Sequence, residues 1–152
     1  MVTYAAVVHD PIDPGSVLAR VGHPEDGAAL LFVGVVRNHA EGRAVRGMRY
    51  DAYEEMAAQV LRAIADEAAR ALGTDRIAVV HRVGELSLGE TSVAVAVSSP
   101  HRAEAYAASR YVIEEIKKRL PVWKREHYED GGQAWVQGVT PTPTVPISGG
   151  GE

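Results

Sequence analysis

The 152-residue sequence contains no cysteine, which excludes disulfides, thiolate metal sites and a cysteine nucleophile. It has no apolar run long enough to span a membrane and no signal-peptide pattern at its N-terminus. It also lacks an excess of positive charge, because its formal net charge is −4. Broad binding to nucleic acid or to an anionic membrane is therefore not expected. We expect a cytoplasmic protein in which any basic site is local.

Lysine is scarce as well: only Lys117, Lys118 and Lys124 occur, whereas arginines are spread along the chain. A desolvated lysine can lose its proton and act as a base or nucleophile, which arginine cannot do. The cluster therefore indicates either a reactive amine or cations that favour the C-terminal end of a helix dipole. Helical spacing places Lys117 at the edge of a buried stripe and Lys118 on the solvent side. Burial and neighbouring cations would then lower the pKa of Lys117.

Length and 46% hydrophobic content are typical of one globular domain, which we assign to residues 1–139. Residues 140–152 are rich in Pro, Thr and Gly and are predicted to be a disordered tail. The strand-like segments are residues 2–9, 28–36, 45–53, 76–83, 91–97 and 133–137. Because segment 28–36 is continuously apolar, we expect it to be buried on both faces.

Two long helices are predicted, over residues 54–72, with Gly73 as the C-terminal cap, and over residues 101–120, ended by Pro121. We place Met56 on the buried stripe of the first helix and Tyr106 on that of the second. The mixed order of strands and helices, without regular βαβ repeats, predicts an α+β fold.

The start of the second helix carries a possible anion site. Ser98 and Ser99 offer a capping hydroxyl, and His101 and Arg102 follow Pro100 directly. Cations are unfavourable at this end of a helix unless an anion is bound there, so a phosphate or carboxylate cradle is one interpretation. The other is an arginine paired with a nearby carboxylate. Arg37, at the end of segment 28–36, lines a cleft or begins a solvated loop.

The remaining patterns exclude other chemistries. The histidines have no metal-ligand spacing, so no metal site is expected. There is no phosphate-binding loop and no dinucleotide fingerprint, and we expect no cofactor.

Several ordered motifs carry a family resemblance. They are Phe32-Val33-Gly34-Val35-Val36-Arg37, Tyr50-Asp51-Ala52-Tyr53-Glu54-Glu55-Met56-Ala57, His81-Arg82-Val83-Gly84-Glu85-Leu86, Gly89-Glu90, Ser98-Ser99-Pro100-His101-Arg102, Lys117 and Pro121-Val122-Trp123-Lys124-Arg125-Glu126. In this order they resemble the MoaE family, the large catalytic subunits of molybdopterin synthase. The similarity covers residues 2–136.

The resemblance implies an α/β-hammerhead type of α+β fold, with a mixed, mostly antiparallel sheet packed with two long helices. It implies a homodimer within a heterotetramer, with a small ubiquitin-like sulfur-carrier subunit at each end. The carrier's C-terminal Gly-Gly thiocarboxylate would supply sulfur to cyclic pyranopterin monophosphate, which becomes molybdopterin.

The resemblance also assigns residue roles. Lys117 and Lys124 would be catalytic and would also bind the substrate. Arg37, His101 and Arg102 would bind the substrate phosphate, in part across the dimer. Further substrate-binding positions would be Val35, Val36, Arg125 and Glu126. The residues alone leave two alternatives open: a lyase that forms a Schiff base at Lys117, or a non-catalytic anion-binding module.

Overall fold

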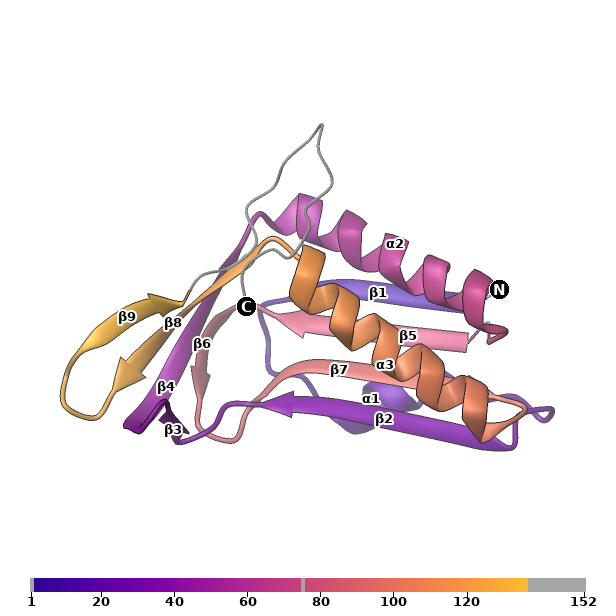
Figure 1. Ribbon diagram of the computed structural model, residues 1–152, viewed down its shortest axis with the longest axis horizontal. Helices are drawn as coiled ribbons and strands as arrows, with labels where there is room; N and C mark the ends of the chain where they lie inside the picture. Colours follow the sequence, from indigo (N-terminus) through magenta and orange to yellow (C-terminus); the bar gives the residue numbers. More distant parts are fainter. Residues whose placement is uncertain (1, 75, 137–152) are drawn as a thin grey trace.

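The computed structural model describes residues 2–74 and 76–136, so the predicted boundary at residue 139 and the predicted tail lie outside the described part. Its first layer is a four-stranded sheet with the order β1 (Val2–Val8), β5 (Arg76–Arg82), β7 (Thr91–Ser99) and β2 (Ala28–Val35). β1 and β5 are parallel, and the other neighbours are antiparallel. The helices α2 (Glu54–Leu72) and α3 (Arg102–Arg119) cover one face (Figure 1), and the short helix α1 (Pro14–Leu18) packs on the other.

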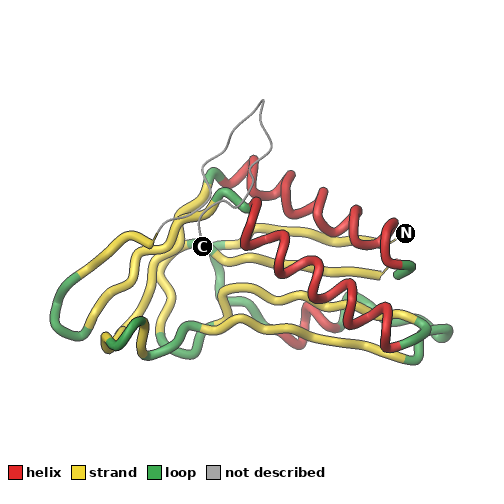
Figure 2. The backbone as a smooth tube through the Cα atoms, in the orientation of Figure 1, coloured by secondary structure: helices red, strands yellow, loops and turns green. Residues whose placement is uncertain are grey.

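A second group of strands extends from one end of the first sheet (Figures 1 and 2). It contains β3 (His39–Ala40), β4 (Arg43–Ala52), β8 (Val122–Tyr128) and β9 (Gln133–Val136) in that order, with β6 (Gly84–Ser87) paired to β4. All of these pairings are antiparallel. The predicted fold class, α+β with a mostly antiparallel arrangement and two long helices, is confirmed.

The main core lies between the two long helices and the first sheet. Leu61 and Ile64 of α2 and Val112 of α3 are completely buried there, against Val79 and Val95 of the sheet. Small residues complete the contact faces of the helices: Ala57, Ala65, Ala68, Ala105 and Ala108. The alanines let the helices lie close to the sheet and to each other.

The same alanines correct two predictions about the helix stripes. Met56 is 39% exposed and Tyr106 is 62% exposed, so neither belongs to the core. The buried face of each helix is turned towards its alanines, away from these larger side chains. The bounds of α2 were predicted correctly, and Gly73 ends it with φ 73°, in the left-handed region that glycine favours.

The prediction that segment 28–36 is buried on both faces is wrong. β2 is an edge strand, with Phe32 38% and Val35 52% exposed, and the fully buried strand is β7. A continuous apolar sequence suits a strand covered by another molecule as well as one inside a sheet.

The predicted serine cap of α3 is also wrong. Ser98 and Ser99 belong to β7, and the residue at the N-cap is His101, whose side chain makes no capping hydrogen bond. Ser98 instead donates to Asp26 at 2.7 Å and accepts from the Gly22 amide at 2.9 Å. The serine hydroxyl therefore ties the end of β7 to the loop before β2.

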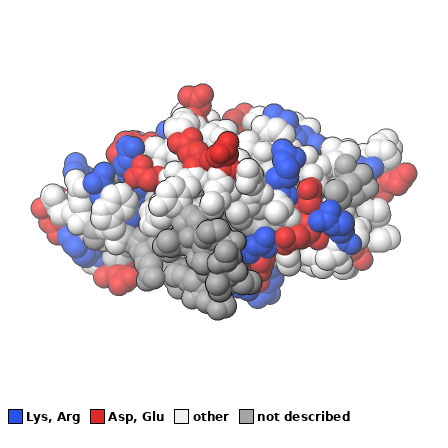
Figure 3. Space-filling model, turned by 90° about the horizontal axis from the view of Figure 1, so that it is seen from above, with Lys and Arg blue, Asp and Glu red and all other residues white. Residues whose placement is uncertain are grey.

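Acidic and basic side chains are interspersed on the face shown in Figure 3. The described part of this face carries no broad basic patch, in line with the formal net charge of −4. Within the described residues, no helix is both long and apolar enough to cross a membrane.

Candidate active site

A cavity of about 330 Å³ lies where the end of α3 meets the second group of strands and the end of β2. Its apolar wall includes Phe32, Val93, Ile113, Ile116 and Leu120. The polar and charged side chains that line it are Arg37, His39, Tyr50, His81, Ser92, Lys117, Lys124 and Glu126.

Both lysines assigned by the resemblance reach this cavity from different elements. Lys117 belongs to the last turn of α3, and Lys124 lies on β8, after Pro121 has ended the helix. Residues 122–128, which the sequence analysis did not recognise as a strand, pair with β4 and so return the chain past the helix end. Because side chains alternate along a strand, Lys124 and Glu126 line the cavity and Arg125 does not.

The end of α3 is fixed to α2 by a bidentate ion pair. Arg119 donates to the two carboxylate oxygens of Glu67 at 2.7 and 3.0 Å, and the Tyr111 hydroxyl donates to the same carboxylate at 2.9 Å. Lys118 points away and pairs with Glu115 at 3.5 Å, as its helical position predicted. The helix end that carries Lys117 is thus held in place without a direct contact to that lysine.

The expectation that burial concentrates on Lys117 is wrong, because Lys117 is exposed and Lys124 is the partly buried amine. Burial lowers the pKa of Lys124, the positive charges of Lys117 and Arg37 lower it further, and the Glu126 carboxylate opposes them. Arg37 and Lys117 are therefore close enough to Lys124 for their charges to act on its amine.

Within residues 2–74 and 76–136, Arg37, Lys117 and Lys124 form no ion pair, although most other arginine contacts described here are to acids. The acid in the cavity, Glu126, accepts a hydrogen bond from the Tyr128 hydroxyl at 2.8 Å. The cavity therefore holds a local excess of positive charge on an acidic protein, which suits an anionic ligand.

The inner wall contains polar residues to which the sequence analysis assigned no individual role. Tyr50 and His81 meet edge to face, with ring centroids 5.2 Å apart. Burial raises the pKa of Tyr50, while its hydrogen bond to Ser92 acts in the opposite direction. Ser92 donates onward to the Gly34 carbonyl at 3.3 Å. Strand alternation placed Tyr50 on one face of β4, but no local signal showed that this face borders a cavity.

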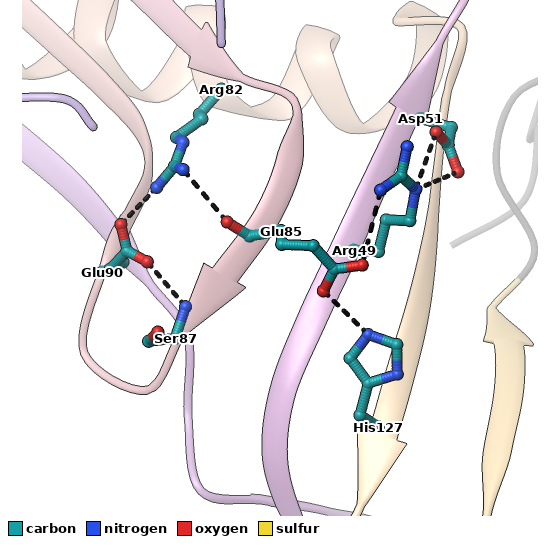
Figure 4. A network of polar contacts seen from close by, with 7 residues as sticks. All are labelled: Arg49, Asp51, Arg82, Glu85, Ser87, Glu90 and His127. Atoms are coloured by element: carbon teal, nitrogen blue, oxygen red, sulfur yellow. Dashed lines mark hydrogen bonds and ion pairs between the residues drawn. The ribbon is translucent and has the colours of Figure 1, made fainter. Parts of the chain in front are cut away.

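A buried arginine joins the two groups of strands next to this wall (Figure 4). The Arg82 guanidinium donates to the carbonyls of His9 at 3.2 Å and Glu85 at 3.0 Å and forms an ion pair with Glu90. Glu90 also accepts from the Ser87 amide at 2.7 Å, and its own carbonyl accepts from the amide of Val36 at 3.1 Å. Arg82 thereby positions the turn after β6 against Val36, which lines the cavity.

The other predicted site residues are placed as follows. Val35 and Val36 line the cavity beside Arg37. The Arg125 guanidinium stacks over the Trp135 ring, 4.7 Å from its centroid. His101 and Arg102 are exposed at the opposite end of α3, about 22 Å along the helix axis from Lys117 at the usual rise per residue. One copy of the chain therefore does not bring its own His101 and Arg102 into this cavity.

Comparison with known proteins identifies the family of this chain. The family described as MoaE protein matches residues 7–119. The molybdopterin synthase catalytic subunit of Halalkalibacterium halodurans is 40% identical over 141 residues, which cover 93% of this chain and 90% of that protein. The crystal structure of molybdopterin synthase from Staphylococcus aureus has a TM-score of 0.79 at 38% identity, and the match covers 86% of this chain and 94% of the other.

A complex of subunits 1 and 2 of the molybdopterin-converting factor from Helicobacter pylori contains a chain with the same fold. Its TM-score is 0.68 at 22% identity, with 86% of this chain and 88% of the other covered, so this likeness concerns the fold alone. The family match and the bacterial relative each span most of the chain. The chain therefore belongs to the MoaE family of molybdopterin synthase catalytic subunits.

Proposed function

We propose that the cavity is the reaction site of a sulfur transferase. The sulfur of a carrier protein's C-terminal thiocarboxylate is transferred to cyclic pyranopterin monophosphate, and two transfers build the dithiolene of molybdopterin. The observation that supports this proposal most strongly is that Arg37, Lys117 and Lys124 line one cavity and form no ion pair with any residue that the structure describes. Both reactants are anions, and unpaired cations in a partly buried site attract them and stabilise charge that develops during reaction.

Each lysine has a distinct part in the proposed reaction. The thiocarboxylate sulfur bonds to a side-chain carbon of the pterin while a C–O bond at that carbon breaks, and the oxygen leaves as water or, where the cyclic phosphate opens, on the phosphate group. Water then cleaves the acyl–sulfur bond, so that sulfur stays on the pterin and the carrier leaves as a carboxylate. Lys117, exposed at the cavity mouth, polarises the acyl group and passes protons. Lys124, the partly buried amine, stabilises the negative charge that forms on the reacting atoms. Arg37 binds the phosphate.

The carrier is a separate small subunit in this proposal. The Helicobacter pylori complex contains two subunits of the molybdopterin-converting factor, and one of them has the fold described above. A ubiquitin-like carrier with a flexible Gly-Gly end could reach the cavity mouth, where Lys117 is exposed.

A homodimer would explain why His101 and Arg102 are remote from the cavity of their own chain. β2 is an edge strand that carries the exposed residues Phe32 and Val35, and both residues also line the cavity. A second copy of β2 could pair with this edge, which would cover the apolar residues and close the cavity.

Strand register then predicts which partner residues arrive. Ala28, at the start of β2, lies opposite Ser99 of β7, so His101 and Arg102 are near the start of β2. Antiparallel pairing of two β2 strands places the start of one beside the end of the other. The partner's His101 and the partner's Arg102 would therefore approach Arg37 and complete the phosphate site.

The first experiment measures molybdopterin formation from thiocarboxylated carrier and cyclic pyranopterin monophosphate. Lys117→Ala and Lys124→Ala should each abolish product formation without changing the oligomeric state. Lys118→Ala is the matched control, since this neighbouring lysine is 60% exposed and pairs with Glu115. Full activity of both cavity variants would remove the sulfur-transfer mechanism and favour a binding module. Trapping of a carbonyl substrate on Lys117 by borohydride would instead favour the Schiff-base lyase.

The second experiment tests the shared site by mixing two inactive variants. A dimer of one Lys117→Ala subunit and one His101→Ala subunit has one site with both residues intact if His101 acts across the interface. Dissociation and reassociation of the two variants should therefore restore activity. If His101 acts within its own chain, both sites of the mixed dimer stay defective and no activity returns.

A further inference from the structure

His81 is a buried histidine in the cavity wall that the proposed reaction has not used. It lies on β5, is only 5% exposed, and its Nδ1 atom is 2.9 Å from the Arg82 carbonyl oxygen. A carbonyl can only accept, so Nδ1 carries the hydrogen and Nε2 is left with a lone pair. Burial lowers the pKa of His81 to about 4. The positive charge of Lys117 lowers this pKa as well, whereas the hydrogen bond to the Arg82 carbonyl raises it. The ring is therefore neutral at physiological pH.

The surroundings of His81 fix this tautomer. The Arg82 side chain is held by Glu85 and Glu90 (Figure 4) and by the His9 carbonyl, so the carbonyl that accepts from Nδ1 belongs to an anchored residue. The edge of Tyr50 meets the imidazole at an interplanar angle of 81°, which restricts rotation of the ring. His81 is thus presented in one orientation.

Nε2 is available to a ligand. Within residues 2–74 and 76–136, Nε2 has no hydrogen-bond partner. It is also absent from the buried side-chain atoms that lack a partner, which means that Nε2 is accessible to solvent. Because His81 itself lines the cavity, the open side of Nε2 is the cavity. A neutral acceptor is therefore present in a site whose three cations can only donate.

The positions of these groups give the cavity two chemically different ends. Arg37 and Lys117 are exposed at the mouth, whereas His81 is buried in the inner wall. A ligand with an anionic group at one end and an N–H donor at the other would bind with its charge outward. The carrier has its negative charge at its C-terminal end. Its thiocarboxylate is therefore stabilised most when it stays among the cations at the cavity mouth.

We propose that His81 determines substrate specificity: its Nε2 accepts a hydrogen bond from a ring N–H of the heterocyclic phosphate while the cations hold the phosphate. This inference rests on the proposed function and adds the orientation of the substrate. A neutral acceptor serves here better than a carboxylate, because it selects an N–H group without neutralising the cations that bind the anion.

Three substitutions of His81 test the role of Nε2. His81→Phe keeps a ring against Tyr50 but has no acceptor, and it should raise the KM for cyclic pyranopterin monophosphate about tenfold, the value of one neutral hydrogen bond. Its kcat and its KM for the thiocarboxylated carrier should not change. His81→Gln, which can place an oxygen near the Nε2 position, should recover most of the affinity. His81→Asn can reach the Arg82 carbonyl but not that position, and should behave like His81→Phe.

Nitrogen-15 NMR of the wild-type protein gives a second readout that does not depend on a variant folding. The free protein should show Nδ1 protonated and Nε2 unprotonated, and adding substrate should shift the Nε2 signal in the direction of hydrogen bonding. A hydrogen on Nε2 in the free protein, or an unchanged substrate KM in His81→Phe, would overturn the inference. A rise confined to the carrier KM would overturn it too. Each result leaves the sulfur-transfer proposal standing, because that proposal fails only if the cavity lysines are dispensable.

Discussion

The Arg82–Glu90 ion pair should be a strong link between the two groups of strands. We consider Arg82→Met, Glu90→Gln and the double variant, all close in size to the original residues. The Arg82 side chain is 9% exposed and that of Glu90 is 28% exposed, so water replaces the lost contacts only in part. The backbone carbonyls of His9 and Glu85 lose their donor as well when Arg82 is replaced.

Removing one partner of a buried ion pair costs about 3–5 kcal/mol, and the partial exposure of Glu90 places Arg82→Met near the lower limit, about 3 kcal/mol. Glu90→Gln should cost about 2 kcal/mol, since the amide oxygen can still accept from Arg82. The double variant should cost little more than Arg82→Met alone. Its coupling energy would then be about 2 kcal/mol.

Urea denaturation of the four proteins measures this coupling. The Arg110–Glu114 pair on α3 is the control, because its side chains are 80% and 52% exposed and such pairs often contribute nothing measurable. A coupling energy below about 0.5 kcal/mol for Arg82–Glu90 would refute the argument that this pair is a structural link.

The pH dependence of stability gives an independent check on the same pair. The Ser87 amide and the Arg82 guanidinium hold the pKa of Glu90 below its usual value of 4.5, with burial opposing them. The unfolded chain therefore binds this proton at a higher pH than the folded protein. The stabilisation is present above pH 4.5 and is lost as the pH falls through the folded-state pKa. Glu90→Gln should lack this component of the acid dependence.

Two further predictions concern the cavity. Lys124→Met should abolish turnover yet raise the urea midpoint at neutral pH, because burial and the neighbouring cations lower the pKa of Lys124 and make its charge unfavourable. The wild-type protein should gain stability relative to this variant as the pH rises from the folded-state pKa towards 10.5; an unchanged midpoint and parallel pH curves would contradict this. Gly34→Ala should cost about 1–3 kcal/mol by overpacking, since a Cβ there would lie 2.8 Å from Val93 Cγ1. Val93→Ala should restore stability to that variant, and failure to do so would mean that the strain lies elsewhere.

The sequence predicts the helices well, because the residues that determine where each helix begins and ends lie within the helix or next to it. The apolar spacing of α2 and its glycine cap gave both ends of the helix, and Pro121 marked the end of α3. The same reasoning failed at residues 122–128, where Lys124, Arg125 and Glu126 give no simple alternation of apolar and polar residues. One face of β8 borders a charged cavity, so a functional surface replaced the usual hydrophobic pattern.

The errors in burial have a different cause. The apolar sequence of β2 by itself predicts an internal strand, and the position of Lys117 beside the stripe of α3 by itself predicts a buried amine; the structure shows neither. The burial of β2 and the burial of Lys117 each depend on neighbours that are distant in sequence. β7 and not β2 is central, and the β8 strand returns beside the helix end, so Lys124 is the amine that becomes partly buried. Helical spacing could sort Lys117 from Lys118 but could not compare Lys117 with Lys124.

The distribution of ion pairs connects stability with function. Arg43, Arg49, Arg82 and Arg119 each contact a carboxylate, whereas the cations around the cavity contact none in the part of the chain that the structure describes. Carboxylate partners at the cavity would relieve the mutual repulsion of Arg37, Lys117 and Lys124, but they would also compete with an anionic substrate. The cations are instead held by the elements that carry them: α3 through Arg119 and Glu67, β8 through its pairing with β4, and the end of β2 through the turn that Arg82 anchors. An unpaired charge costs stability in the free protein and becomes useful when the substrate supplies the missing anion.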